Sequence, residues 1–180
     1  MKKTASWWWI LATGTAHAWR LSVGAGADWA QAPGLGGVLG MRGVSAQAVV
    51  SDRPFAGRAF AFVLGASRLA TPLPARRVET ITAWRGRCVW EWRLPLTYAL
   101  RPWWGVGLGV DRLQRNRRYV KDALGYAQIH EPARDNWLPV WSVVAVAPLP
   151  ARLAVQLSLA SAVGPHPLST VTVSLMWRIV

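Results

Sequence analysis

The sequence predicts an all-β fold, an eight-stranded antiparallel transmembrane β-barrel with up-and-down strand order, preceded by a cleavable signal peptide. The chain has 180 residues and is 52% hydrophobic, but its apolar residues are spread over short segments instead of long uninterrupted runs. In these segments apolar and polar side chains alternate, which is typical of strands with two different faces. The segments number eight, and a closed antiparallel barrel with both termini at one end needs an even number.

The first 18 residues have the three regions of a secretory signal peptide. Two lysines follow the initiating methionine, and the apolar stretch TASWWWILATG is too short to span a bilayer. Ala16 and Ala18 supply the small residues that signal peptidase requires at positions −3 and −1. We therefore expect a signal peptide at 1–18 and a barrel domain at 19–180. The alternative is a short buried N-terminal helix.

The first predicted strand, 19–29, alternates without a fault. Trp19 and Trp29 lie at the two ends of its apolar face, and Arg20 and Asp28 lie on the opposite, polar face. At a rise of ~3.3 Å per residue and a tilt of ~45°, the two tryptophans would stand about 23–25 Å apart along the membrane normal. That distance matches the height of an apolar band between two aromatic girdles.

The other seven strands are predicted from the same alternation. Two of them are irregular. In the strand 38–50 the alternation shifts by one residue near Gly43, which predicts a β-bulge. In the strand 138–147, Trp141 lies on one face and Val140 and Val144 on the other, so both faces could be the apolar one. The segment 78–84 is expected to extend the second hairpin above the membrane. The predicted strand ranges are 38–50, 58–68, 86–98, 102–113, 138–147, 151–162 and 170–180.

The predicted connections alternate in length along the chain. Short, proline-rich turns on the periplasmic side and longer loops outside are the asymmetry expected of such a barrel. The short connections are 51–57, 99–102 and 147–150, and the longer ones are 30–37, 69–85, 114–137 and 163–169.

The stretch WEWRLPLTYALRPWWGVGLGVD, residues 90–111, resembles the recurrent strand–turn–strand phrase of outer-membrane barrel-domain proteins. As a pattern, the whole mature chain resembles the small eight-stranded outer-membrane barrels of the OmpA/OmpX type. The resemblance implies localisation in the outer membrane of a Gram-negative bacterium, insertion by the barrel-assembly machinery and a monomeric state. Such barrels usually finish on an aromatic residue that the assembly machinery reads, whereas this chain ends on Ile179 and Val180.

Outward-facing aromatic residues are expected to form the girdles at the two membrane surfaces, where tryptophan and tyrosine are enriched. The predicted girdle residues are Trp19, Trp29, Trp90, Trp92, Tyr98, Trp104, Trp141 and Trp177.

The stretch PWWGVGLGVDR, residues 102–112, carries glycine at every second position. A phosphate-binding glycine loop needs a helix directly after the glycines, so that backbone amides and the helix dipole face the phosphate. No helix signal follows these glycines, and both the GxGxxG spacing and the lysine of a P-loop are absent. We therefore expect the glycines to face the interior of a narrow barrel, where they leave room for bulky opposing side chains.

Charged residues on the inward-facing parity are expected to form a hydrogen-bonded ion network that plugs the barrel, because unpaired charges would be costly there. A proton or ion path is the alternative. The predicted network residues, inside the barrel or at its rims, are Arg20, Asp28, Glu91, Arg93, Asp111, Arg152 and Arg178.

The chain is strongly basic, with a net charge of +13 that falls to about +11 when the signal peptide is removed. This charge suggests an anionic partner, and export argues against nucleic acid. Basic residues gather in the third predicted loop, where arginine is well suited to the phosphates of lipopolysaccharide; an ordinary solvated loop is the alternative. The predicted contact residues are Arg112, Arg115, Arg117, Arg118 and Lys121.

No catalytic, cofactor-binding or metal-binding residues are predicted. Outer-membrane lipid A deacylases share this barrel size and use a histidine and a serine that lie close together on a lipid-facing strand. In this chain His130 and His166 both lie in predicted loops. The lone Cys88 provides neither a lipobox nor a disulfide. We expect a non-catalytic structural or surface protein that contacts outer-membrane lipid and lipopolysaccharide. The alternatives are a narrow ion or small-solute channel, a deacylase-like hydrolase, and a soluble lipocalin-type ligand-binding barrel.

Overall fold

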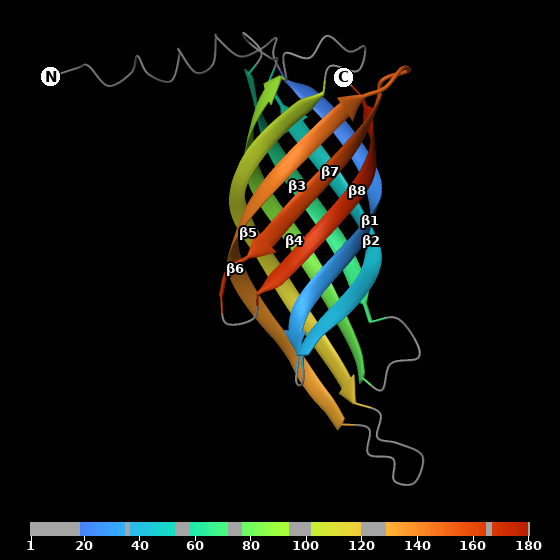
Figure 1. The fold of residues 1–180 in the computed structure, drawn as a ribbon, viewed down its shortest axis with the longest axis vertical. Helices are drawn as coiled ribbons and strands as arrows, with labels where there is room; N and C mark the ends of the chain where they lie inside the picture. Colours follow the sequence, from blue (N-terminus) through green and yellow to red (C-terminus); the bar gives the residue numbers. More distant parts are fainter. Residues whose placement is uncertain are drawn as a thin grey trace, which may run out of the picture.

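Eight antiparallel strands form one closed barrel in the computed structural model (Figure 1). The structure describes residues 19–34, 37–52, 58–71, 77–93, 102–119, 129–164 and 167–179. The predicted fold class is confirmed, whereas the predicted signal peptide with Ala16 and Ala18 lies outside the described residues. The described part of the chain contains no helix long and apolar enough to cross a membrane. The strands are β1 (Arg20–Gly34), β2 (Gly37–Ser51), β3 (Arg58–Ala70), β4 (Arg77–Arg93), β5 (Trp103–Tyr119), β6 (Ile129–Pro148), β7 (Leu153–Ala162) and β8 (Leu168–Arg178).

Pairing between β1 and β8 closes the barrel, with Ser22 opposite Arg178 and Trp29 opposite Val171. β1 therefore begins where β8 ends, and we call this end of the barrel the terminal end. The opposite end, where β1 passes into β2, is called the distal end. Every strand pairs with its sequence neighbours, as an up-and-down barrel requires.

The first six strands are all longer than the sequence indicated, and the fourth, fifth and sixth are the longest. β4, β5 and β6 have 17, 17 and 20 residues and reach beyond the others at the distal end (Figure 1). Much of the predicted loops 69–85 and 114–137 is therefore strand, and 78–84 extends a hairpin as expected. The predicted loop 30–37 is also largely strand, because Gly34 pairs with Gly37. The two ends of the barrel therefore differ more in strand length than in loop length. The chain beyond the other strands stays paired at the distal end, because pairing satisfies the backbone hydrogen bonds.

The register of β2 corrects the predicted bulge. β2 pairs without interruption with both β1 and β3, so Gly43 faces inward in phase with its neighbours. A Cβ atom at Gly43 would lie 2.0 Å from the carbonyl oxygen of Arg68, so glycine is needed there for close approach of two backbones. A register shift occurs elsewhere, between Arg115 and Arg117 of β5.

The turn between β6 and β7 corrects a second expectation. Ala151 and Arg152 have φ angles of 59° and 63°, and the Leu153 amide donates to the carbonyl oxygen of Pro150 at 3.3 Å. Two successive left-handed residues form the type I′ geometry that matches the twist of a hairpin. β7 therefore begins at Leu153, and the exposed Arg152 lies in the turn instead of the interior ion network.

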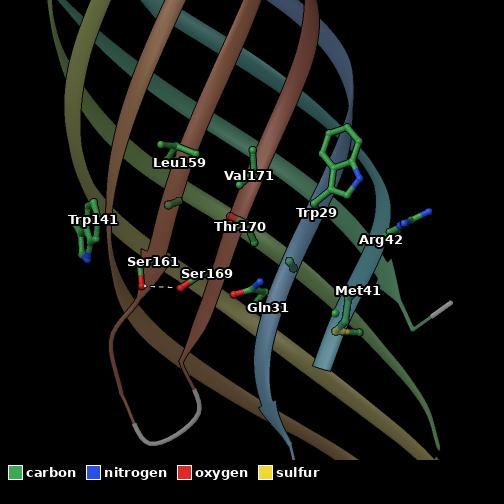
Figure 2. Close-up of a pocket in the computed structure, with 13 residues that line it drawn as sticks. Trp29, Gln31, Met41, Arg42, Trp141, Leu159, Ser161, Ser169, Thr170 and Val171 are labelled. Carbon is green, nitrogen blue, oxygen red and sulfur yellow. Dashed lines mark hydrogen bonds between the residues drawn. The ribbon is translucent and has the colours of Figure 1, made fainter. Parts of the chain in front are cut away.

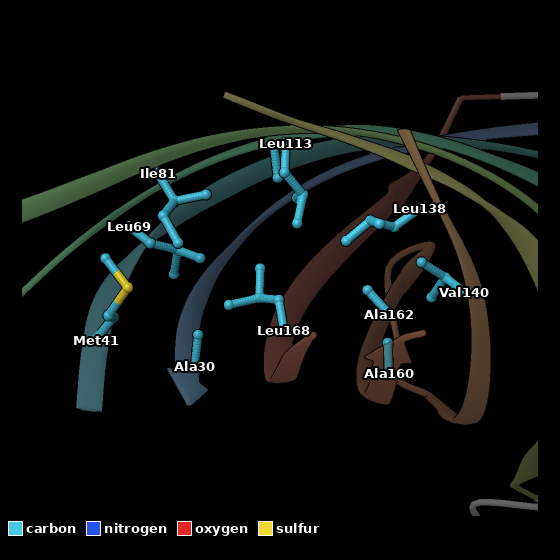
Figure 3. Close-up of a cluster of buried hydrophobic side chains, with 11 residues drawn as sticks. Ala30, Met41, Leu69, Ile81, Leu113, Leu138, Val140, Ala160, Ala162 and Leu168 are labelled. Atoms are coloured by element: carbon cyan, nitrogen blue, oxygen red, sulfur yellow. The ribbon is translucent and has the colours of Figure 1, made fainter. Parts of the chain in front are cut away.

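The described lumen is layered along its length. The distal half is filled by an apolar plug of buried side chains, which includes Met41, Leu69, Ile81, Leu113 and Leu168 (Figure 3). A second, smaller apolar layer around Ala61, Val89 and Val144 lies toward the terminal end. Polar and charged side chains occupy the space between the two layers. Alternation alone did not reveal the apolar plug, because both faces of the distal strand segments carry some apolar residues.

Candidate functional site

Two arginines from β4 form the centre of a buried ion network between the apolar layers. The Arg85 guanidinium pairs with Asp28 of β1 at 3.1 Å and lies 3.9 Å from Asp111 of β5. Arg87 donates to both carboxylate oxygens of Asp111, at 2.8 and 3.4 Å. These two arginines and two aspartates balance in charge, which is the condition under which buried ions are tolerated.

Hydroxyl groups complete this network. Ser45 donates to Asp28 at 3.0 Å, and Arg85 donates to Ser67 at 2.9 Å and to Thr172 at 3.4 Å. The partners come from β1, β2, β3, β4 and β8, so the network ties much of the barrel circumference together. Hydrogen bonds that join several strands in this way hold a filled interior in one arrangement.

The β5 glycines provide the space for the β4 arginines. Gly105, Gly107 and Gly109 face inward, as predicted. A Cβ atom on Gly109 would lie 2.8 Å from both Cα and Cγ of Arg87 and 2.1 Å from the carbonyl oxygen of Gly86. The period-two glycines therefore let β5 approach the strand that carries the arginines.

The predicted network residues separate into three groups. Asp28 and Asp111 lie in the central network. Arg20, Glu91 and Arg178 line a cavity of about 110 Å³ at the terminal end, which Asp52 also lines. The remaining two predicted members, Arg93 and Arg152, have exposed side chains, and Arg93 lies 6.0 Å from the ring centroid of Trp103.

Sequence reasoning missed Arg85 and Arg87, the central cations. The predicted fourth strand, 86–98, contains Arg87 but not Arg85, and the inward parity of Glu91 and Arg93 is not extended back to either arginine. Counting back in twos from Glu91 reaches Val89, Arg87 and Arg85, all of which face inward. This signal was present in the sequence.

We expect the purified protein to give no stepwise ion conductance in planar bilayers. Two apolar layers and a charge-balanced ion network block the described lumen, and an eight-stranded barrel is only wide enough for its own side chains. A wide porin measured in the same bilayers is the positive control. Reproducible single-channel steps from the purified barrel would contradict this expectation.

Aromatic side chains cover the outer wall at both ends of the barrel. At the terminal end these side chains form ring contacts. The centroids of Phe60 and Trp90 are 5.3 Å apart, and those of Trp92 and Trp104 are 5.1 Å apart. Trp19, Trp29, Trp90, Trp104, Trp141 and Trp177 are exposed on the outer wall, Trp92 is partly exposed, and Tyr98 lies outside the described residues. Between the belts the wall is apolar, with exposed Leu64, Val106, Leu108, Val173 and Leu175.

Trp84 and Trp137 are two further outward-facing tryptophans at the distal end that the sequence did not suggest. Trp137 is the more exposed of the two, at 67%. Trp137 lies in a predicted loop, and Trp84 lies in the segment expected to extend a hairpin above the membrane. The observed strands place both on the outer wall.

Arginines alternate with these tryptophans at the distal end. Arg42 pairs with Trp29, and Arg112 lies between Trp84 and Trp137 on the neighbouring strands. Arg68 lies on β3, where it pairs with Val44 of β2 and Thr82 of β4. We call this outward-facing set the distal belt: Trp29, Arg42, Arg68, Trp84, Arg112, Trp137 and Trp141.

Arg112 differs from the other belt arginines because it has an acidic partner. Its guanidinium donates to both carboxylate oxygens of Asp135, with Nε at 3.0 and 2.9 Å, and lies 5.7 Å from the ring centroid of Trp137. Among the described residues, no ion pair joins Arg42 or Arg68 to an acidic side chain.

The structure changes the predicted set of lipopolysaccharide contacts. Arg115 is 3% exposed and faces the lumen, where it donates to the carbonyl oxygen of Pro167 at 3.5 Å. It shares the inward parity of Asp111, so it cannot belong to an exposed basic cluster. Arg112 is exposed, and Arg117 and Arg118 lie on β5 with side chains outside the described set. Lys121 lies outside the described residues.

The described residues contain no group of three or more His, Cys, Asp or Glu side chains that could hold a metal ion. Ser161 and Ser169, on neighbouring strands, form a hydrogen bond with each other at 3.2 Å. His130 lies on β6 with its side chain outside the described set, and His166 lies outside the described residues.

The fold is similar to that of solved barrels, although no similar sequence is found. No family model matches the chain, and no curated protein matches it in sequence. Ail, the attachment invasion locus protein of Yersinia pestis, solved in complex with the heparin analogue sucrose octasulfate, superposes with a TM-score of 0.62 at 10% identity, covering 89% of this chain and 99% of Ail. Neisserial surface protein A superposes with a TM-score of 0.55 at 12% identity, covering 87% of this chain and 96% of that protein.

The fold is that of the small eight-stranded outer-membrane barrels. The apolar wall between two aromatic belts is the surface such a barrel presents to lipid.

Proposed function

We propose that this protein is integrated in the outer membrane of a Gram-negative bacterium, with its distal end outward, and has a non-catalytic structural or surface role in which the distal belt contacts lipopolysaccharide. The apolar outer wall supports membrane integration, because exposed Leu64, Leu108 and Leu175 would be unfavourable in water. The filled lumen, with a charged layer between two apolar layers, argues against a lipocalin-type barrel, which binds its ligand in an open apolar cavity. Insertion by the barrel-assembly machinery and a monomeric state belong to the same proposal.

The arginines of the distal belt are the observation that carries the lipopolysaccharide proposal. Arg42 and Arg68 are exposed, face outward from neighbouring strands and are diagonal neighbours in the pairing of β2 with β3. Diagonal neighbours lie about 7–8 Å apart, so two guanidinium groups can approach one phosphate or two adjacent phosphates.

The tryptophans of the belt place these arginines at the correct height. Tryptophan side chains lie at the boundary between the apolar membrane interior and the headgroups. Arg42 is directly paired with Trp29, so its long side chain can reach the layer of lipid phosphates. Ail, which shares the fold, has been solved with a polyanion, sucrose octasulfate, and this supports an anionic partner for the present barrel.

Replacing Arg42 and Arg68 together by glutamine is expected to weaken lipopolysaccharide binding at least about tenfold. Each arginine makes charge-assisted hydrogen bonds to phosphate, each worth about 1.5–3 kcal/mol, and about 1.4 kcal/mol corresponds to tenfold. The affinity of the refolded full chain for purified lipopolysaccharide would be measured in detergent at several salt concentrations. The dependence on salt should also decrease in the variant.

The matched control is the double variant Arg58→Gln/Arg93→Gln. It removes the same charge from two exposed arginines at the terminal end of the barrel. We expect it to bind lipopolysaccharide as the unchanged protein does. Equal binding by both double variants would refute a contact at the distal belt.

A further inference from the structure

A groove of about 570 Å³ opens in the outer wall at the distal end, between Trp29 and Trp141 (Figure 2). It crosses the strands on either side of the barrel closure, from β6 through β7, β8 and β1 to β2. The two tryptophans stand on opposite sides of it, and both are about half exposed.

Strand register explains why the wall is hollow there. Ser161 lies between Trp141 and Ser169 on the neighbouring strands, and Ser169 in turn pairs with Gln31. Gln31 pairs with Gly40, which has no side chain. This row of small and polar residues lies next to Trp141, so the outer wall is hollowed where the small side chains meet the bulky one.

The next row toward the membrane centre is apolar. Leu159 pairs with Val171, and Val171 pairs with Trp29. All three side chains are exposed on the outer wall. Arg42 ends this row as the partner of Trp29, and it also lines the groove. The groove therefore has a polar distal row, an apolar inner row and one cationic corner.

This arrangement of polar, apolar and cationic residues is complementary to one class of lipid. Ser161 and Ser169 form one hydrogen bond with each other, but their hydroxyls and the Gln31 amide keep further hydrogen-bonding capacity, for which the apolar membrane interior offers no partner. A phosphorylated sugar supplies hydroxyl groups for Ser161, Ser169 and Gln31 and a phosphate for Arg42. Its attached acyl chain would lie along Leu159 and Val171, toward the membrane centre.

We infer that this groove binds one lipid A moiety of lipopolysaccharide, with a sugar phosphate at Arg42 and an acyl chain between Trp29 and Trp141. The inference rests on the proposed function and goes beyond it, because it assigns a defined site to the lipid portion. The distal belt arginines by themselves would attract any phosphate, whereas the groove adds selectivity for a lipid that carries sugar hydroxyls.

The test fills the groove without removing charge. Ser169→Trp places a large side chain between the two wall tryptophans, and Val106→Trp places the same side chain on exposed, lipid-facing β5 outside the groove. Binding of purified lipid A and of phosphatidylglycerol to the refolded full chain would be compared by native mass spectrometry. Heat-modifiability gels would establish that each variant is folded.

We expect Ser169→Trp to weaken lipid A binding at least about tenfold, Val106→Trp to leave it within about twofold, and Ser169→Ala to have an intermediate effect. Unchanged lipid A binding by folded Ser169→Trp, together with loss of binding by Arg42→Gln/Arg68→Gln, would overturn the groove assignment and leave the proposed function standing. An equal loss of lipid A and phosphatidylglycerol binding in Ser169→Trp would overturn the assignment to lipid A. Absence of lipopolysaccharide and lipid A binding by the unchanged protein would overturn both proposals.

Discussion

Replacement of Asp111 by alanine is expected to lower the free energy of unfolding by about 3–5 kcal/mol, the usual cost of breaking a buried ion pair from one side. Asp111 accepts two hydrogen bonds from Arg87 and lies 3.9 Å from Arg85. Without it, two buried guanidinium groups would have only Asp28 to balance them. Urea unfolding of the barrel refolded in lipid vesicles would measure the loss.

The chain offers a matched control in Asp135→Ala. Asp135 also pairs with an arginine, Arg112, but these side chains are 38% and 46% exposed. Water screens an exposed pair and leaves it little net stabilisation, so the control should unfold almost as the unchanged protein does. Replacing Arg87 and Asp111 together by methionine and leucine should recover much of the stability. Equal losses for Asp111→Ala and Asp135→Ala would contradict the role of the buried network.

Replacement of Gly109 by alanine is the second substitution with a large expected effect. The added Cβ atom would lie 2.1 Å from the carbonyl oxygen of Gly86 and 2.8 Å from Cα of Arg87, and both are backbone atoms that cannot rotate away. β4 and β5 would have to separate, which would strain the pairing and displace Arg87 from Asp111. We expect a loss of about 1–3 kcal/mol, measured as a lower urea midpoint.

Gly86→Ala is the control for this substitution. Gly86 is on the neighbouring strand, but it faces outward, and its added Cβ atom would meet other atoms only at 4.0 Å. Its unfolding should change by no more than about 0.5 kcal/mol. If both alanine variants unfold at the same urea concentration, close approach of β4 and β5 at Gly109 is not what requires glycine.

The membrane-spanning core of each strand could be predicted from sequence because lipid and lumen impose opposite requirements on alternate residues. Trp19 to Trp29 alternates without a fault for this reason, and the inward glycines of β5 follow from the same parity. The ambiguity of β6 is resolved in favour of Trp141 facing outward and Val140 and Val144 facing inward.

The distal strand extensions could not be predicted in the same way. Beyond the membrane both faces of a strand meet water or other polar groups, so the alternation fades and RLQRNRRY has the composition of a loop. Pairing of β5 with β4 and β6 decides that this stretch is a strand. Arg115 was therefore assigned to an exposed loop, although its side chain faces the lumen.

The sequence by itself determined the class of barrel, the number of strands and the face that most central residues occupy, because a period of two is a local property of the chain. Which inward residues meet was decided only by the tertiary structure. Asp28 and Arg85 are 57 positions apart, and the stagger of the closed barrel brings their side chains together. The same lateral register assembles the groove from five strands, because neighbours across a sheet depend on pairing and not on distance along the chain.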